Sequence, residues 1–243
     1  MADLPTPDFL AGIRALYPST TSYDPNLWAV VAAVSFSASN VAEAVPFVFK
    51  WALDELIQAQ QRANTPTDVA NAEQLALARK IREALLQSGL LSGMPRAITS
   101  LVALHKVMPE HLRETKPLRD TKKSPEECDK RGEDLFRAVY RDSAQRVQTL
   151  LHSAYPDLGW FCTTVGYGMT YGGTDVFTPI ELIYVMVAAL IAVDASTELG
   201  WHLSNARRSG APLAETRAVR STAMQVASRA GVVWKAGVPD VAE

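Results

Sequence analysis

Cysteine and paired metal ligands are scarce in this sequence. Of its 243 residues only Cys128 and Cys162 are cysteines, and they lie far apart. This excludes the disulfide framework of small secreted domains and indicates a reducing compartment. The histidines are equally isolated, and no His-x-x-x-His or Glu-x-x-His pair would hold a metal from one helical face. They are His105, His111, His152 and His202. We expect no metal site.

An excess of charge of one sign is also missing. The chain has 24 Lys and Arg against 26 Asp and Glu, for a formal net charge of -2. Such a balance offers no basic surface for a phosphate backbone, so we expect no nucleic-acid partner. The first residues, MADLPTP, lack the cationic start and apolar run of a secretion signal and the arginines of a mitochondrial transit peptide. We therefore expect a cytoplasmic protein.

Long hydrophobic runs are absent too. The longest apolar stretch extends from Leu182 to Val193. It is shorter than the roughly 20 residues that a helix needs to cross a bilayer. The stretch therefore predicts a buried helix, and we expect no membrane passage.

What the sequence does contain is helical periodicity. Apolar residues recur every three or four positions, whereas alternating strand patterns and Asn-Gly or Asp-Gly hairpin signals are missing. This predicts an all-α fold, with the clearest helices at 67–88, 95–108, 125–140, 179–193, 196–208 and 213–230. Two of them begin with capping boxes, Ser124 to Glu127 and Thr178 to Glu181, which place a proline at the first helical position and a glutamate at the third.

The segments between these helices differ in character. Residues 115–129 carry four basic and four acidic side chains, which is typical of a solvated connection. Residues 155–177 are rich in glycine and aromatic side chains and predict a long loop of the kind that carries function. The solvated connection divides the chain into a helical half at residues 1–115 and a second helical half at residues 124–243.

The two halves contain a weak internal echo. The segment that begins at Tyr23 resembles the one that begins at Phe177, each with an X-Pro pair, an apolar helix, a short polar break and a second helix. In this alignment Pro46 falls at the position of His202, so a duplicated site would have lost its histidine in the first half. The alternative is that two buried helix pairs look alike through composition alone.

Candidate catalytic groups gather in the second half. Glu198 and His202 are four residues apart on one predicted helix, a spacing that lets the carboxylate hydrogen-bond the imidazole and make it more basic. A histidine oriented in this way can transfer protons. Glu181 is a further candidate. The structural alternatives are a surface pair for Glu198 and His202, and a helix-capping role for Glu181.

A set of motifs in the second half forms a longer pattern. It consists of Arg131-Gly132, Tyr167-Gly168, Glu181, His202, Ala206 and the stretch Gly210 to Glu215. With this pattern, the segment from Arg131 to Trp234 resembles the carboxymuconolactone decarboxylase and alkyl hydroperoxidase D group. The resemblance implies an all-α alkyl hydroperoxidase D-like fold and a homo-oligomer, typically a trimer or hexamer. It also implies that the first half is a divergent copy.

One departure from that group concerns its thiols. Peroxidase-type members have a Cys-x-x-Cys shortly before the histidine, whereas this sequence has Ala195 and Glu198 at those positions. This excludes disulfide-based peroxide reduction through the motif. Cys162 is expected to be a buried structural thiol. The resemblance therefore implies the thiol-free branch, whose decarboxylase members act on a lactone acid without a cofactor.

The expected function is a cofactor-free lyase for a small carboxylated or lactone substrate. His202, oriented by Glu198, would act as general acid or base, with Glu181 as a second proton-transfer group. The candidates for substrate binding are Tyr167, Tyr171, Trp160 and Arg207. The aromatic rings can equally be packing residues, and an arginine also stabilises a helix C-terminus. The alternative function is a non-catalytic oligomeric member that has lost the peroxidase cysteines.

Overall fold

The computed structural model describes residues 5–18 and 24–242. Within these ranges the chain is helical and contains no strand, which confirms the all-α class. The α-helices are α1 (Pro7–Arg14), α2 (Leu27–Ala38), α3 (Val45–Ala63), α4 (Thr67–Ser92), α5 (Met94–Val107), α6 (Pro125–Tyr140), α7 (Ala144–Ala154), α8 (Pro156–Trp160), α9 (Pro179–Ala192), α10 (Ser196–Arg208) and α11 (Leu213–Arg229). None of the described helices combines the length and apolarity that crossing a membrane needs.

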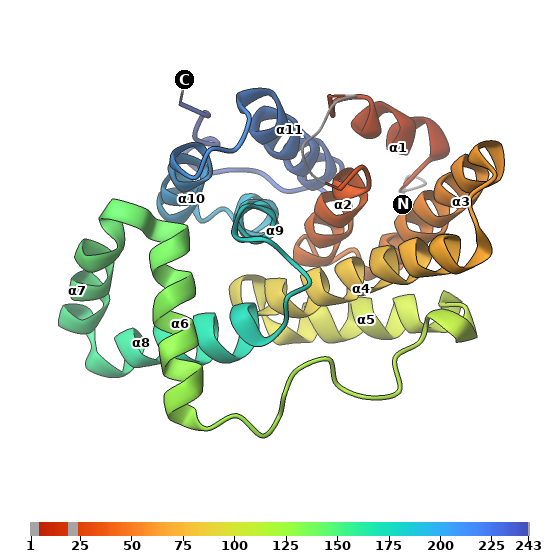
Figure 1. The fold of residues 1–243 in the computed structure, drawn as a ribbon. Helices are drawn as coiled ribbons and strands as arrows, with labels where there is room; N and C mark the ends of the chain where they lie inside the picture. The colour runs from red at the N-terminus through yellow and green to blue at the C-terminus, as the bar shows by residue number, and fades with distance from the viewer. Residues whose placement is uncertain (1–4, 19–23, 243) are drawn as a thin grey trace.

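Two helices, α2 and α9, form the centre of the fold (Figure 1). Every residue of α2 is buried, and so is every residue of α9 from Glu181 to Ala192. A helix that is apolar on all sides gains most by lying inside a core. Small side chains let α2 and α9 pack closely, and the fully buried ones include Ala32, Ala33, Ala188 and Ala189.

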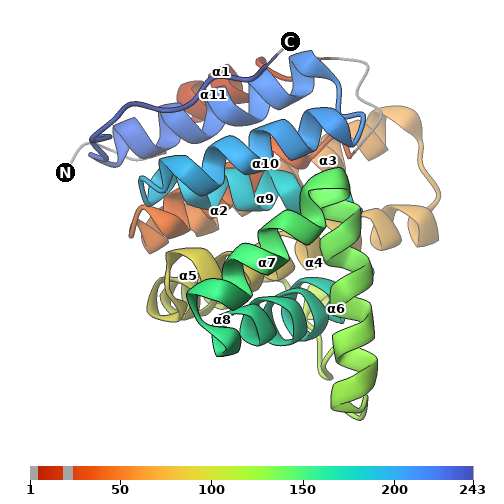
Figure 2. The ribbon, with the colours of Figure 1, turned by 90° about the vertical axis from the view of Figure 1, so that its left-hand side faces the viewer.

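The other helices surround this central pair. Both α4 and α11 contact α2 and α9, while α10 packs on α9, and α3 and α5 pack on α2 and α4. Helices α6 to α8 lie on the opposite side of α9 and α10 from α1 and α11 (Figure 2). One hydrophobic cluster contains residues from both 1–115 and 124–243. The two predicted halves therefore share a core, and their division stays a prediction; Tyr23, where the echo begins, lies outside the described residues.

Most predicted helices are confirmed to within one residue at either end, namely those at 95–108, 125–140, 179–193, 196–208 and 213–230. The capping boxes at Ser124 and Thr178 are present. A third one that the sequence allows, from Asn40 to Glu43, is absent from the described structure, because Asn40 has φ +63° and makes no side-chain cap. The helix that begins at Thr67 is longer than predicted, because it continues through Gly89 to Ser92 and ends at Gly93, which has φ +96°. A Cβ at Gly89 would lie 2.6 Å from the Met94 sulfur, so this glycine serves close packing rather than helix termination.

The prediction of a long loop at residues 155–177 is wrong. After α8 the chain forms a π-helix, η4 (Phe161–Thr170), and a 3-10 turn, η5 (Tyr171–Gly173). The π-helix packs against α6 with backbones almost in contact. A Cβ at Gly132 would lie 2.1 Å from the Thr163 carbonyl oxygen, and one at Gly168 would lie 2.0 Å from that of Cys128. Gly168, one of the glycines that suggested a loop, is therefore needed for this helix contact. π-helices are rare and are frequently found at functional sites.

Candidate functional site

His202 lies in the interior of the fold, where α10 packs against α9 and α6. Its side chain is almost fully buried, with 4% of the residue exposed. The Nε2 atom lies 3.5 Å from the hydroxyl oxygen of Tyr140, at the C-terminal end of α6. The Nδ1 atom is buried and has no hydrogen-bond partner among the described residues. A buried polar atom without a partner is uncommon in folded proteins, and a ligand can complete its bonding.

Aromatic rings from α6 and the π-helix segment extend from this imidazole. The Tyr140 ring lies 5.5 Å from the His202 ring and stacks on Phe136 at 4.3 Å, measured between centroids. Tyr167 packs against Phe136 at 4.9 Å and against Tyr171 at 5.3 Å. The close approach of α6 and the π-helix brings these rings together. We call His202, Phe136, Tyr140, Tyr167 and Tyr171 the His202 cluster.

Burial sets the protonation states of the His202 cluster. Loss of water around His202 lowers the pKa of its imidazole to about 4, so the ring is neutral at pH 7. Burial raises the pKa of Tyr140 to about 12 and those of Tyr167 and Tyr171 well above their ordinary value. The cluster is therefore an uncharged set of hydrogen-bond donors and acceptors at neutral pH.

Glu198 does not contact His202 as the spacing predicted. The residue is exposed, and in the described part of the chain no hydrogen bond joins its carboxylate to the imidazole. One turn of α10 separates a solvent-facing carboxylate from an inward-facing ring. Burial is the main cause of the raised pKa of Tyr140, and the charge of Glu198 adds to it. Glu198 therefore acts on the cluster only through its charge.

Glu181 belongs to a different network. Its Oε2 accepts hydrogen bonds from the backbone N–H and the hydroxyl of Thr178, both at 2.9 Å, as in a capping box. Its Oε1 lies 2.5 Å from the Nζ of Lys80, which also pairs with Asp24 at 3.1 Å. Both carboxylate oxygens are thus engaged in holding the start of α9. No described hydrogen bond or ion pair links Glu181 to His202.

The four predicted substrate-binding residues separate in the structure. Tyr167 and Tyr171 belong to the His202 cluster. Trp160 is 55% exposed and lines another cavity beside His152. Arg207 donates a hydrogen bond to the carbonyl of Ala211 just beyond the end of α10, which fits a helix-terminal role. Only the two tyrosines therefore come together with His202.

The cluster contains two residues that the sequence did not reveal, Phe136 and Tyr140. They are four residues apart on α6, and such a pair stacks on one face of a helix. That spacing was a usable signal for their contact with each other. The approach of Tyr140 to His202, 62 residues away, was not readable from local pattern. Across the described residues, no three His, Cys, Asp or Glu side chains are grouped to hold a metal ion.

Comparison with known proteins finds relatives in two yeasts. The chain is 26% identical over 259 residues to Peroxisomal protein 2 of Saccharomyces cerevisiae, with 88% of this chain and 92% of the relative covered. It is 29% identical over 163 residues to Peroxisomal protein 2 of Schizosaccharomyces pombe, with 65% of this chain and 74% of the relative covered. No known family profile matches the chain.

The names of these relatives correct one expectation. Both point to the peroxisome, so the cytoplasmic localisation expected from the sequence is wrong. The expectation rested on the lack of a secretion or mitochondrial signal. Peroxisomal import uses receptor-read signals that need neither an apolar run nor an arginine-rich segment.

Proposed function

We propose that this protein is a cofactor-free lyase that removes CO₂ from a small lactone acid at the His202 cluster. The observation that carries the proposal is a buried, neutral imidazole whose Nε2 faces the Tyr140 hydroxyl and whose Nδ1 has no hydrogen-bond partner within residues 5–18 and 24–242. The resemblance of residues 131–234 to the carboxymuconolactone decarboxylase group supplies the reaction class. The names of the two relatives support action in the peroxisome.

The surroundings of His202 suit decarboxylation. The other members of the cluster are Phe136, Tyr140, Tyr167 and Tyr171, and none of them carries a charge at neutral pH. A substrate carboxylate that leaves water for such surroundings loses hydration. In the transition state the charge spreads into the lactone, so it loses less hydration energy than the carboxylate does. Desolvation therefore favours the loss of CO₂.

The His202 and Tyr140 pair can supply the proton that the reaction consumes. Breaking the bond to CO₂ leaves its electron pair on the lactone as an enolate, which hydrogen-bond donors stabilise. The Nδ1–H of His202 delivers a proton to the ring carbon, Nε2 takes the proton of Tyr140, and Tyr140 regains one from solvent. This tautomer leaves Nε2 as the acceptor that faces the tyrosine hydroxyl. Glu181 has only its helix-capping role in this scheme.

A turnover assay tests the proposal. The wild-type protein is incubated with carboxymuconolactone, and CO₂ release is followed together with the loss of substrate absorbance. We expect His202→Gln and Tyr140→Phe to lower kcat by roughly 10²- to 10⁴-fold, the usual contribution of a positioned acid or base. Arg137→Gln, at an exposed position of α6, is the control and should retain the wild-type rate. An inactive wild type, or His202→Gln and Tyr140→Phe variants with the wild-type rate, would overturn the proposal.

The second candidate is a non-catalytic oligomeric protein. The observation that favours it is a stripe of exposed apolar side chains on α5, since Met94, Ile98 and Val102 are 38%, 55% and 53% exposed. Their spacing of four residues places them on one side of the helix. Light scattering after size-exclusion chromatography tests the assembly, which Ile98→Lys should disrupt. An assembled wild type that turns over no lactone acid would favour this candidate over the lyase.

A further inference from the structure

A cavity of about 460 Å³ lies outside the His202 cluster. It is lined by α4, by the connection that leads to α6, by α6 itself through Arg131, and by the turn that precedes α9. Its volume is within the range of about 300–1,000 Å³ that is typical of small-molecule sites. Four cationic side chains line it, against the two carboxylates of Asp120 and Asp175; the cations are Arg79, Lys80, Lys123 and Arg131. No residue of the His202 cluster is among its lining residues.

Two of these cations are already paired by the fold. Lys80 pairs with Asp24 and Glu181, and Arg79 pairs with Glu114 at 2.6 Å. Burial alone would lower the pKa of Lys80, but the two carboxylates reverse this and raise it, so Lys80 is a permanent cation. None of the three carboxylate partners is among the described lining residues. A ligand in the cavity would therefore contact these cations and not their carboxylate partners.

The other two cations are available to a ligand. Lys123 forms no ion pair or side-chain hydrogen bond with any described residue. Arg131 pairs at 2.7 Å with Asp175, whose side chain is 95% exposed. An ion pair with so exposed a carboxylate contributes little to stability. An anionic ligand can therefore replace Asp175 with little loss of stability. Arg131 and Lys123 would then both bind the same anionic group of the ligand.

The turn before α9 carries unpaired backbone amides at residues that line the same cavity. The amides of Thr174, Asp175 and Val176 form no hydrogen bond with a backbone carbonyl in the described part of the chain. All three residues line the cavity. Successive free N–H groups favour anions, because each presents a partial positive charge.

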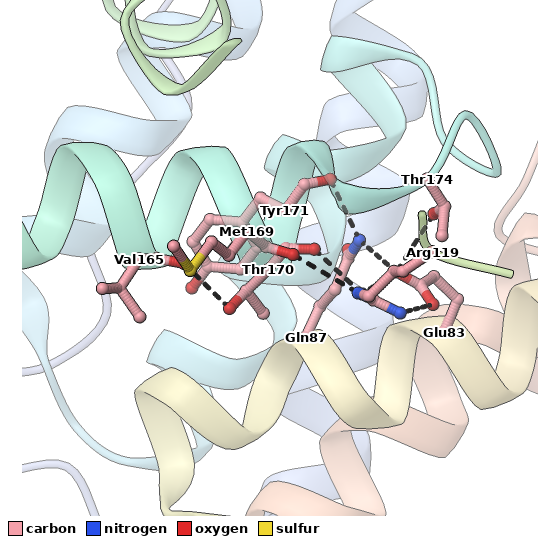
Figure 3. Close-up of polar contacts among 8 residues, drawn as sticks. All are labelled: Glu83, Gln87, Arg119, Val165, Met169, Thr170, Tyr171 and Thr174. Atoms are coloured by element: carbon pink, nitrogen blue, oxygen red, sulfur yellow. Dashed lines mark hydrogen bonds and ion pairs between the residues drawn. The ribbon is translucent and has the colours of Figure 1, made fainter. Parts of the chain in front are cut away.

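An ion pair between the buried Glu83 and the partly exposed Arg119 holds one wall of the cavity in place. Figure 3 shows Arg119 reaching from the connection to Glu83 on α4 and to the end of the π-helix. Its guanidinium lies 2.5 and 3.0 Å from the two oxygens of Glu83 and 2.9 Å from the Thr170 carbonyl. The neighbouring residues Leu118 and Asp120 line the cavity. This wall of the cavity is therefore held in place by the fold itself, whereas Arg131 has to exchange Asp175 for the ligand.

We propose that this cavity binds a small organic dianion, either a dicarboxylate or a phosphate monoester. Arg131 and Lys123 bind one anionic group, and the amides of the turn before α9 add donors. Leu118 and Val176 pack against the carbon skeleton. Charge-assisted hydrogen bonds of this kind are stronger than hydrogen bonds between neutral groups.

Isothermal titration calorimetry of the full chain tests this site, with glutarate and glycerol 3-phosphate as probes at constant ionic strength. We expect saturable binding of at least one probe, and the preferred probe distinguishes a dicarboxylate site from a phosphate site. Lys123→Gln and Arg131→Gln should each weaken binding about 10-fold or more, because each removes a charged hydrogen bond.

Lys106→Gln is the matched control, since it removes the same charge from an exposed position on α5. It should leave the affinity unchanged, and so should His202→Gln. Because Lys123 has no ion-pair or hydrogen-bond partner among the described residues, its replacement isolates the loss of a ligand contact from a loss of structure. The absence of saturable heat with both probes would overturn the proposal. Equal weakening by Lys106→Gln and Lys123→Gln, or wild-type affinity in Lys123→Gln, would overturn it too.

Discussion

The ion pair between Arg119 and Glu83 gives the sharpest prediction of stability. Glu83 is only 4% exposed, and both of its oxygens accept hydrogen bonds from the guanidinium. Gln87 and Thr174 also donate to Oε1, at 2.8 and 3.2 Å, whereas Arg119 is the only described donor to Oε2. Arg119→Gln would therefore leave a buried carboxylate without its counter-ion. Breaking a buried pair in this way costs about 3–5 kcal/mol.

Thermal unfolding measures this loss. For a chain of this length each kcal/mol corresponds to roughly 2–4 °C in Tm, so we expect Arg119→Gln to lower Tm by roughly 6–20 °C. Adding Glu83→Gln to that variant removes the stranded charge and should restore part of the stability, as a double-mutant cycle would show. Arg137→Gln breaks an exposed pair with Glu133 and should cost less than about 1 kcal/mol. A loss equally small in Arg119→Gln would refute a buried, stabilising pair.

Three further predictions follow from the packing. Gly168→Ala should destabilise the fold by about 3 kcal/mol in urea unfolding, because its Cβ would lie 2.0 Å from a carbonyl oxygen of α6. Gly200→Ala, where a Cβ meets nothing within 4 Å, should be neutral or stabilising, and equal effects at both sites would contradict this account. Because the pKa of His202 is about 4 in the fold and 6.5 in the unfolded chain, only the unfolded chain takes up a proton between these values. Stability should therefore fall by about 3 kcal/mol as the pH drops through that window, and His202→Gln should remove this component. Cys162 is only partly buried, so the expectation of a buried thiol is wrong. Its partial burial still raises the pKa of the thiol, so Cys162→Ser should leave any peroxide consumption unchanged; a loss of consumption would restore a thiol mechanism.

The helices with local start signals could be predicted from the sequence. Thr178 to Glu181 and Ser124 to Glu127 specify their own capping hydrogen bonds, so no distant residue has to be known. The segment at 155–177 could not be predicted in the same way. Gly168 is required by the backbone of α6, and a glycine needed for helix contact looks the same in sequence as one in a loop.

The candidate site shows the same limit. His202 could be singled out because a sequence pattern contains it, and the structure places it in the interior. The residue that contacts its imidazole could not be identified in this way. The spacing of Glu198 places a carboxylate on the same helix, but it does not fix whether that carboxylate faces water or the core. Tyr140 approaches the imidazole only through the packing of α6 against α10. Long-range contacts of this kind leave no local pattern.

The most direct test of the central claim is the ¹⁵N NMR spectrum of the His202 ring in histidine-labelled protein, recorded from pH 7 to pH 5 with and without carboxymuconolactone. The assignment comes from the His202→Gln variant, in which this signal is missing. Burial predicts a neutral imidazole across the whole range, because the pKa lies near 4. A ligand that completes the bonding of Nδ1 predicts a shift of the ring nitrogens when it is added. A ring that becomes imidazolium near pH 6, or one that carboxymuconolactone leaves unchanged, would contradict a buried His202 that acts on this substrate.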